Sequence, residues 1–323
     1  MHNQPFVDLQ GMLLKLYQQH DYGEAFELAN REAGRFPMQI QRMYYWRICL
    51  AALMDNTNLA LLLLEELIAE GYWLPEDWLR NETDLKSLQG VFAFERLLLI
   101  CERRHANAQA HSTPQLMTLL PGTLAYRSST SLPLLLALHG NFRNAGISVD
   151  YWRPSVAENW LLALPQSSQV FGPNIYTWDD REWAEREIIA HMESLDGQHR
   201  LDHQRSVVGG FSVGGRLAIW LALNDIIPLR RFIAVAPLLY EDELDHLRPM
   251  MESCRQRGVR GYIIVGAQDQ RCYQGARAFT KMLHEHDIPC TLEIYAHLGH
   301  DFPPDFDQSL LRALHVLNRE DTN

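Results

Sequence analysis

A serine flanked by glycines, between a strand pattern and a helix pattern, is the feature that most constrains this chain. The pentapeptide GFSVG (210–214) follows the short apolar run 206–209 and precedes the longer apolar run 213–223. The first run has the length of a buried strand and the second that of a buried helix. Gly210 and Gly214 allow the backbone to crowd around a sharp, strained turn. We therefore expect Ser212 at the carboxyl edge of a sheet, with the N-terminus of the next helix directed at it.

Composition excludes several classes of protein. With 323 residues the chain has room for two domains, and 47% hydrophobic and 21% charged residues are typical of a soluble globular protein. No apolar run reaches the length of a membrane span, and the N-terminal residues lack the pattern of a signal peptide. The formal net charge of −11 argues against a nucleic-acid partner.

The five cysteines are scattered, odd in number and free of any C-x-x-C pair. Neither a disulfide framework nor a zinc site is therefore expected, and a reducing cytoplasm is the simplest location.

The first hundred residues carry a helical pattern with no candidate strand. Helices are predicted over 21–35, 40–54 and 59–70. Their lengths and short turns resemble the helix-turn-helix units of tetratricopeptide repeats, although only about two units fit. The resemblance implies a surface for a protein partner or for self-association. A helical segment that only packs on the rest of the chain is the open alternative.

The expected domain boundaries follow a change in composition. Residues 103–115 (RRHANAQAHSTPQ) are polar, rich in small side chains and without periodicity, which is typical of a linker. We place this linker at 105–115, between a helical domain of residues 1–104 and a second domain of residues 116–323.

Strand patterns alternate with helix patterns in the second domain, which indicates a mostly parallel sheet of about eight strands with helices on both faces. An antiparallel pair at 117–120 and 124–126 is expected to open it. The later strands are continuously apolar, as strands covered on both faces should be. They are predicted at 134–138, 160–164, 207–209, 232–235, 262–265 and 292–295, with helices over 181–195, 213–223, 275–286 and 308–317.

The histidine expected to act with Ser212 is His300. A general base in such a fold follows the final strand, and the sequence there reads HLGHDF at 297–302. His300 follows a glycine in the loop beyond the strand, where it can turn over the sheet edge. His297 is the alternative, nearer the strand and expected to be half-buried. A histidine at this place can take the Ser212 proton and return it to a leaving group.

An acid that orients this histidine is expected after the preceding strand. The run 262–265 is followed by Gly-Ala-Gln-Asp, in which Asp269 can reach the far nitrogen of His300. The alternatives are the acidic residues Glu241, Asp242 and Glu243, which follow the strand before it.

Two backbone N–H groups are expected to hold the charge that develops on the substrate oxygen. One belongs to Val213, directly after the serine. The other is assigned to Asn141, because His139-Gly140-Asn141 ends an apolar strand. His139, Phe142 and Trp178 are candidate lining residues of the substrate pocket.

Together these motifs resemble the α/β-hydrolase superfamily, and its phospholipase/carboxylesterase and dienelactone-hydrolase-like branches in particular. The resemblance rests on Leu-His-Gly at 138–140, GFSVGG at 210–215, Gly-Ala-Gln-Asp at 266–269 and Gly-His-Asp-Phe at 299–302, and it covers about 116–318. It implies hydrolysis of a small-molecule ester through an acyl-enzyme, without metal or cofactor. Two departures, Asn-Phe at 141–142 and Gln-Arg-Cys at 270–272, leave the family within the superfamily open.

Two other functions remain open at this point. One is a peptidase of the same architecture. The other is a non-catalytic hydrolase-like scaffold whose helical domain recruits a partner, although a scaffold would not need glycines around a strained serine.

Overall fold

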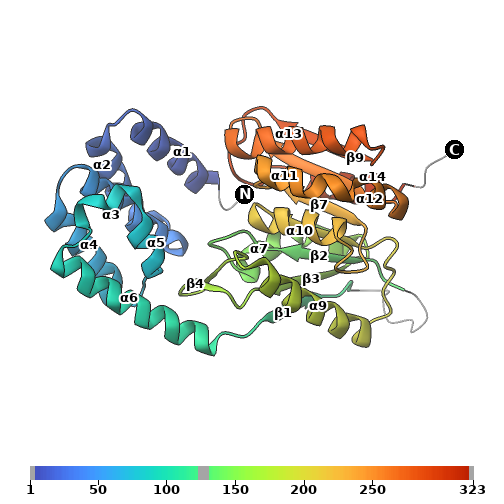
Figure 1. Ribbon diagram of the computed structural model, residues 1–323, viewed down its shortest axis with the longest axis horizontal. Coiled ribbons are helices and arrows are strands. Elements are labelled where there is room, and N and C mark those ends of the chain that lie inside the picture. Colours follow the sequence, from blue (N-terminus) through green and yellow to red (C-terminus); the bar gives the residue numbers. More distant parts are fainter. Residues whose placement is uncertain (1–3, 123–130, 320–323) are drawn as a thin grey trace. The chain divides into compact units, whose positions relative to one another are not determined.

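The computed structural model describes residues 4–122 and 131–319, and the chain divides into two compact units (Figure 1). One unit contains the N-terminal residues as far as Ser112 together with Val170–Asn174, and the other contains Thr113–Gln169 and Ile175–Asn323. We call them the helical unit and the α/β unit.

The helical unit is built from helices that pack on their neighbours in sequence. Its helices are α1 (Gln4–Gln18), α2 (Tyr22–Glu32), α3 (Ile40–Leu53), α4 (Thr57–Ala69), α5 (Glu76–Asn81) and α6 (Phe92–His111). Asp21 and Asn56 cap α2 and α4, because their side chains accept hydrogen bonds from the first-turn N–H groups of those helices. The three helices predicted in this region are thus present, with ends shifted by at most a few residues.

The segment predicted as a linker is mostly helical. Helix α6 continues through residues 105–111, and strand β1 (Gln115–Leu119) begins four residues after the helix ends at His111. Alanine, glutamine and arginine are strong helix formers, so this stretch forms a helix although it lacks an apolar stripe. Within the helical unit, Val170–Asn174 packs on α6: the Val170 N–H donates to Gln109 Oε1, and His105 Nε2 lies 2.9 Å from the Val170 carbonyl oxygen.

The α/β unit contains a mainly parallel sheet in the order β1-β3-β2-β6-β7-β8-β9. Strand β1 pairs antiparallel with β3, and all the other pairs are parallel. The remaining strands are β2 (Leu134–Leu138), β3 (Leu161–Gln166), β6 (Val207–Phe211), β7 (Arg231–Val235), β8 (Arg260–Gly266) and β9 (Cys290–Tyr295). This sheet has seven strands within the described residues, one fewer than expected. The strand predicted at 124–126 lies outside the described residues.

Alternate side chains of each central strand enter two separate cores. Leu134, Leu136 and Leu138 of β2 pack with helices α9 (Arg181–Gln198), α10 (Val213–Leu223) and α13 (Gln270–Glu285). The intervening residues Leu135 and Ala137 pack with helices α7 (Ala145–Trp152) and α14 (Phe306–Leu317) on the other face. Both faces are covered, which explains why the central strands read as continuous apolar runs.

The sequence does not predict four helices of the α/β unit, because each is too short to show a helical period. They are α7, α8 (Pro154–Ala157), α11 (Glu241–Leu247) and α12 (Met251–Arg257). In the part of the chain that the structure describes, no helix combines the length and apolarity needed to cross a membrane. All five cysteines are buried and free.

Candidate active site

Ser212 lies on a strained turn between β6 and α10. Its φ of 54° and ψ of −118° are conformations that side-chain-bearing residues rarely adopt. The turn is held at both ends, since the Ser212 N–H donates to the Val235 carbonyl at 2.8 Å and the Ser212 carbonyl accepts from the Arg216 N–H at 3.0 Å. The expected placement of the serine between a strand and a helix is therefore observed.

The two glycines that flank Ser212 are required by space. Neither has a positive φ. A Cβ added to Gly210 would overlap the backbone of Gly214, and a Cβ added to Gly214 would overlap the carbonyl groups of Leu138 and His139. These glycines therefore let α10 begin against both its own strand and the end of β2.

The structure brings Ser212, His300 and Asp269 together in one hydrogen-bonded chain. His300 Nε2 lies 2.9 Å from Ser212 Oγ, and His300 Nδ1 lies 2.6 Å from Asp269 Oδ2. Because a carboxylate only accepts, Nδ1 carries the proton and Nε2 is left to accept from the serine hydroxyl. Ser212 and Asp269 are each 9% exposed, whereas the His300 side chain is 43% exposed.

Backbone contacts hold the loop of Asp269 against the loop of His300. The Ala267 N–H donates to the Tyr295 carbonyl at 2.9 Å, and the Gln268 N–H donates to the Leu298 carbonyl at 3.0 Å. A Cβ on Gly266 would overlap the Leu298 carbonyl. Gly266 therefore allows the two loops to approach each other closely.

Asp269 stays ionised next to His300. Burial acts to raise its pKa, but the hydrogen bond and charge of His300, together with bonds from Cys272, outweigh burial and hold the pKa of Asp269 below its ordinary value. The Cys272 N–H donates to Asp269 Oδ1 at 3.4 Å. An ionised carboxylate at this place favours the Nδ1–H tautomer of His300 and stabilises the imidazolium that proton transfer would create.

Cys272 also approaches the histidine, with its Sγ 3.5 Å from His300 Nδ1. Burial and the Asp269 carboxylate raise the pKa of this thiol, so it remains protonated at neutral pH and is a poor nucleophile. Among the described residues, Asp269, Cys272 and His300 are the group whose side chains could ligate a metal ion. A metal there would take the same Nδ1 and carboxylate atoms that bond to each other, so it would break the hydrogen bond that orients His300.

The alternative residues do not reach this chain of hydrogen bonds. His297 is exposed, not half-buried as expected, because it lies in the turn directly after β9. Glu241, Asp242 and Glu243 form the first turn of α11, and Glu243 faces Arg216 at 3.6 Å. Of the candidate residues, His300 is the histidine that contacts Ser212 Oγ, and Asp269 is the acid that contacts His300 Nδ1. These contacts favour His300 over His297, and Asp269 over the three acidic residues of α11.

Val213 is the first residue of α10, so its N–H has no carbonyl partner within the helix. The Asn141 side chain holds the neighbouring loop: its Nδ2 donates to Asp179 Oδ1 at 2.7 Å, and its Oδ1 accepts from the Trp178 N–H at 3.1 Å. Their roles as donors to a substrate oxygen stay predictions.

His139 is a buried structural residue, 1% exposed. Its Nδ1 donates to the Gly140 carbonyl at 2.9 Å, and its Nε2 accepts from the Ser167 N–H at 3.3 Å. Burial lowers the pKa of His139 from 6.5 to about 4. The Trp178 indole N–H donates to the His139 carbonyl at 2.9 Å, so the two predicted pocket residues support each other.

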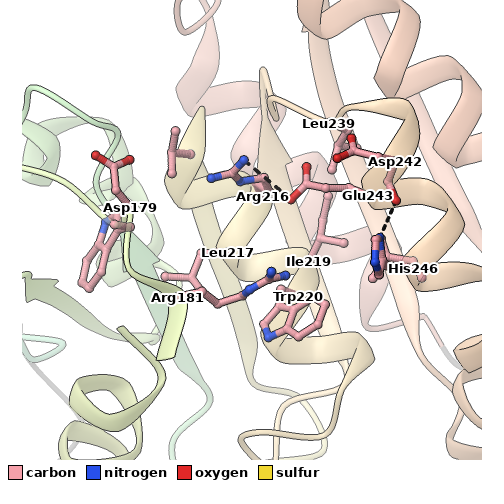
Figure 2. Close-up of a pocket in the computed structure, with 13 residues that line it drawn as sticks. Asp179, Arg181, Arg216, Leu217, Ile219, Trp220, Leu239, Asp242, Glu243 and His246 are labelled. Atoms are coloured by element: carbon pink, nitrogen blue, oxygen red, sulfur yellow. Dashed lines mark hydrogen bonds and ion pairs between the residues drawn. The ribbon is translucent and has the colours of Figure 1, made fainter. Parts of the chain in front are cut away.

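A cavity of about 240 Å³ begins at Val213 and runs along α10. Trp178 lines this cavity, but Ser212, His300, His139 and Phe142 are not among its lining residues. The assignment of His139, Phe142 and Trp178 to a substrate pocket stays a prediction. Figure 2 shows the Arg181 guanidinium beside the Trp220 ring and Arg216 paired with Glu243. The cavity is therefore small, with charged groups along its walls.

Sequence reasoning missed one buried ion pair near Ser212. Arg143 Nη2 lies 3.1 Å from Asp301 Oδ1, and Asp301 directly follows His300. The two residues are 158 positions apart, and a single sequence offers no signal that would pair them.

Comparisons with known proteins agree with this architecture. Residues 6–109 match the family model described as the A/B hydrolase-like N-terminal domain. An uncharacterized protein from Bacillus cereus ATCC 10987 is similar over 97% of this chain and 98% of its own, with a TM-score of 0.56 and 26% identity. The α/β unit has the α/β-hydrolase fold.

Two further structures are similar to about two thirds of this chain. Esterase PE8 has a TM-score of 0.50 and 20% identity, covering 63% of this chain and 99% of that protein. A putative dipeptidyl aminopeptidase IV from Bacteroides ovatus ATCC 8483 has a TM-score of 0.51 and 14% identity, covering 65% of this chain and 34% of that one. A search of curated proteins finds no match. The tetratricopeptide resemblance of the helical unit stays a prediction.

Adding a methyl group beside Ser212 should destabilise the α/β-hydrolase unit. Gly214→Ala forces a Cβ into the carbonyl groups at the end of β2, and such overpacking costs about 1–3 kcal/mol. Gly197→Ala is the matched control, because it lies in α9 with open space around it and should be neutral or slightly stabilising. Thermal unfolding measures both, and equal midpoints for the two variants would contradict this account of the turn.

The buried His139 should make stability depend on pH. Its folded pKa of about 4 lies below the ordinary 6.5, so the unfolded chain binds a proton first and stability is lost as pH falls through this window. Over the whole window, protonation of His139 lowers the free energy of unfolding by about 3 kcal/mol. His139→Gln should be less stable than wild type at pH 7, with a gap in unfolding midpoint that narrows toward pH 4. Parallel curves for the two proteins would show that His139 is not the source.

Proposed function

We propose that this protein is a serine hydrolase that cleaves a carboxylic ester through an acyl-enzyme. The observation that carries the proposal is the continuous hydrogen-bonded chain from Ser212 Oγ through His300 to Asp269, with distances of 2.9 and 2.6 Å. A serine hydroxyl is a weak nucleophile until an adjacent base accepts its proton. In this arrangement the base is in contact with the hydroxyl and is itself oriented by an ionised acid.

The proposed reaction begins when Ser212 Oγ attacks the ester carbonyl carbon. Its proton passes to His300 Nε2, and the carbonyl π electrons move onto oxygen to give a tetrahedral intermediate. The N–H groups of Val213 and Asn141 stabilise this oxyanion. Val213 is the first residue of α10, so the positive end of the helix dipole strengthens the interaction of its N–H with the negative charge. The carbon–oxygen bond to the alcohol then breaks, and His300 returns its proton to the departing oxygen.

Deacylation repeats the same steps with water. His300 Nε2 takes a proton from the water, whose oxygen attacks the acyl carbon, and Ser212 leaves with the proton that His300 gives back. Asp269 remains ionised throughout, because its role is to hold the imidazole and balance the transient imidazolium charge. The sequence of steps consumes one water and releases one acid and one alcohol.

Two observations support an ester as the substrate. The motifs at the ends of β2, β6, β8 and β9 resemble those of the carboxylesterase branch, and one of the structures with the same fold is called esterase PE8. The strained Ser212 and the glycines packed around it argue against a scaffold, because a protein without catalysis has no need of that strain.

Hydrolysis of p-nitrophenyl acetate tests the proposal. Wild type should release p-nitrophenol, whereas Ser212→Ala and His300→Ala should each lose at least about 10³-fold in kcat. His297→Ala is the matched control, because this exposed histidine lies three residues from His300 and should leave kcat unchanged. Equal activity in wild type and Ser212→Ala would refute the proposal.

Cavity size predicts which esters are preferred. At about 240 Å³ the cavity beside Val213 is below the ~300–1,000 Å³ typical of ligand pockets, so a short acyl group fits best. We expect kcat/KM to be higher for p-nitrophenyl acetate and butyrate than for octanoate and palmitate. Arg216→Leu removes a guanidinium from the cavity wall and should shift the preference toward the longer chains. An unchanged ranking in this variant would show that the acyl group binds elsewhere.

A further inference from the structure

We propose that Arg143 and Asp301 form a clamp that positions His300, an inference that rests on the proposed function of Ser212. Asp301 is the residue directly after His300, so its position constrains the imidazole through a single peptide unit. Arg143 Nη2 lies 3.1 Å from Asp301 Oδ1, and the two side chains are only 11% and 6% exposed. The pair is therefore shielded from solvent, unlike the half-exposed His300 that it neighbours.

The arginine also reaches the strand that carries the serine. Its guanidinium carbon lies 4.6 Å from the ring centre of Phe211, the residue before Ser212, and 5.8 Å from the ring centre of Phe302. The Phe211 and Phe302 rings stack with their centres 4.7 Å apart. One guanidinium thus holds the chain on both sides of the site, next to the nucleophile and next to the base.

The histidine ring rests on the same cluster. The centres of the Phe211 and His300 rings are 5.1 Å apart. Tyr151 stacks on Phe302 at 3.9 Å and lies 5.9 Å from the Arg143 guanidinium carbon, which encloses the cluster on the α7 side. Aromatic faces attract a guanidinium most strongly where water is excluded.

Holding two segments together with a buried ion pair carries a large desolvation cost. Removing two charges from water offsets most of their attraction, so apolar residues would give equal or better stability. What the pair adds is direction, because a guanidinium and a carboxylate accept few relative geometries. Here that direction fixes the loop 299–302, and with it the 2.9 Å contact between His300 Nε2 and Ser212 Oγ.

The clamp should act on the rate of reaction and not on substrate binding. Neither Arg143 nor Asp301 lines the cavity beside Val213. Moving His300 away from Ser212 lengthens the Nε2–Oγ contact and weakens proton transfer from the serine. It leaves the residues that line the cavity beside Val213 unchanged. Loss of the clamp should therefore lower kcat with little change in KM.

The test compares Asp301→Asn with the double variant Arg143→Met/Asp301→Asn. The single variant leaves a buried guanidinium unpaired and can fail to fold, whereas the double variant leaves no unpaired charge and keeps a side chain over Phe211. Asp225→Asn is the control for loss of an ion pair away from the site. Asp225 is 56% exposed and pairs with Arg257 at the same distance of 3.1 Å, and it lies beyond the C-terminal end of α10, whose N-terminal end adjoins Ser212.

Three quantities are measured for each protein: the thermal midpoint, the second-order rate of labelling by a fluorophosphonate, and kcat and KM for p-nitrophenyl acetate. The double variant should keep a folded transition, lose ~10- to 100-fold in kcat and in labelling rate, and keep KM within about twofold. Asp225→Asn should match wild type in both rates. The single variant Arg143→Lys keeps the positive charge and leaves Asp301 unchanged. Its kcat and labelling rate should lie between those of the double variant and wild type.

A folded double variant with wild-type kcat and labelling rate would overturn the clamp. So would a double variant that does not fold, because the pair would then be needed for stability alone. Failure of the proposed function looks different, since wild type itself would then not label at Ser212, and the clamp would fall with it.

Discussion

The structure depends on one imidazole that must bond to two side chains from separate strand ends. His300 accepts from Ser212 at the end of β6 and donates to Asp269 beyond the end of β8, and it is carried by the loop after β9. These strands lie on the same parallel sheet, so their carboxyl ends meet at one edge. Neighbouring strands are about 4.8 Å apart, which brings loops of ordinary length within hydrogen-bonding reach.

Several residues at that edge of the sheet have strained backbone conformations. Phe142, Ser212 and Ala236 have positive φ angles of 60°, 54° and 44°, and they follow β2, β6 and β7, which are neighbours in the sheet. Each such residue costs of order 1–3 kcal/mol, so backbone strain is present where three neighbouring strands end. The continuous apolar cores on both faces of the sheet offset this cost.

Much of this architecture was predictable from local sequence. The central strands are continuous apolar runs because both faces are buried, and the GFSVG turn has a steric requirement that leaves a visible glycine pattern. Chain order then assigns His300 and Asp269, because the base and the acid follow particular strands. The helix over 213–223 was predicted with both ends correct.

Other features depend on contacts that a single sequence does not reveal. The pairing of Arg143 with Asp301 spans 158 positions, and the burial of His139 follows from loops that fold over it. The polar segment 105–111 has no apolar stripe, so its sequence predicts a linker although it forms the last turns of α6. Likewise Val170–Asn174 belongs to the helical unit although its neighbours in sequence belong to the α/β unit.

Mass spectrometry of the protein after reaction with a fluorophosphonate tests the central claim most directly. The account predicts one adduct per chain, located by peptide mapping on Ser212, and its loss when His300 is replaced by alanine. An adduct on any other residue, or undiminished labelling of Ser212 without the His300 imidazole, would contradict it.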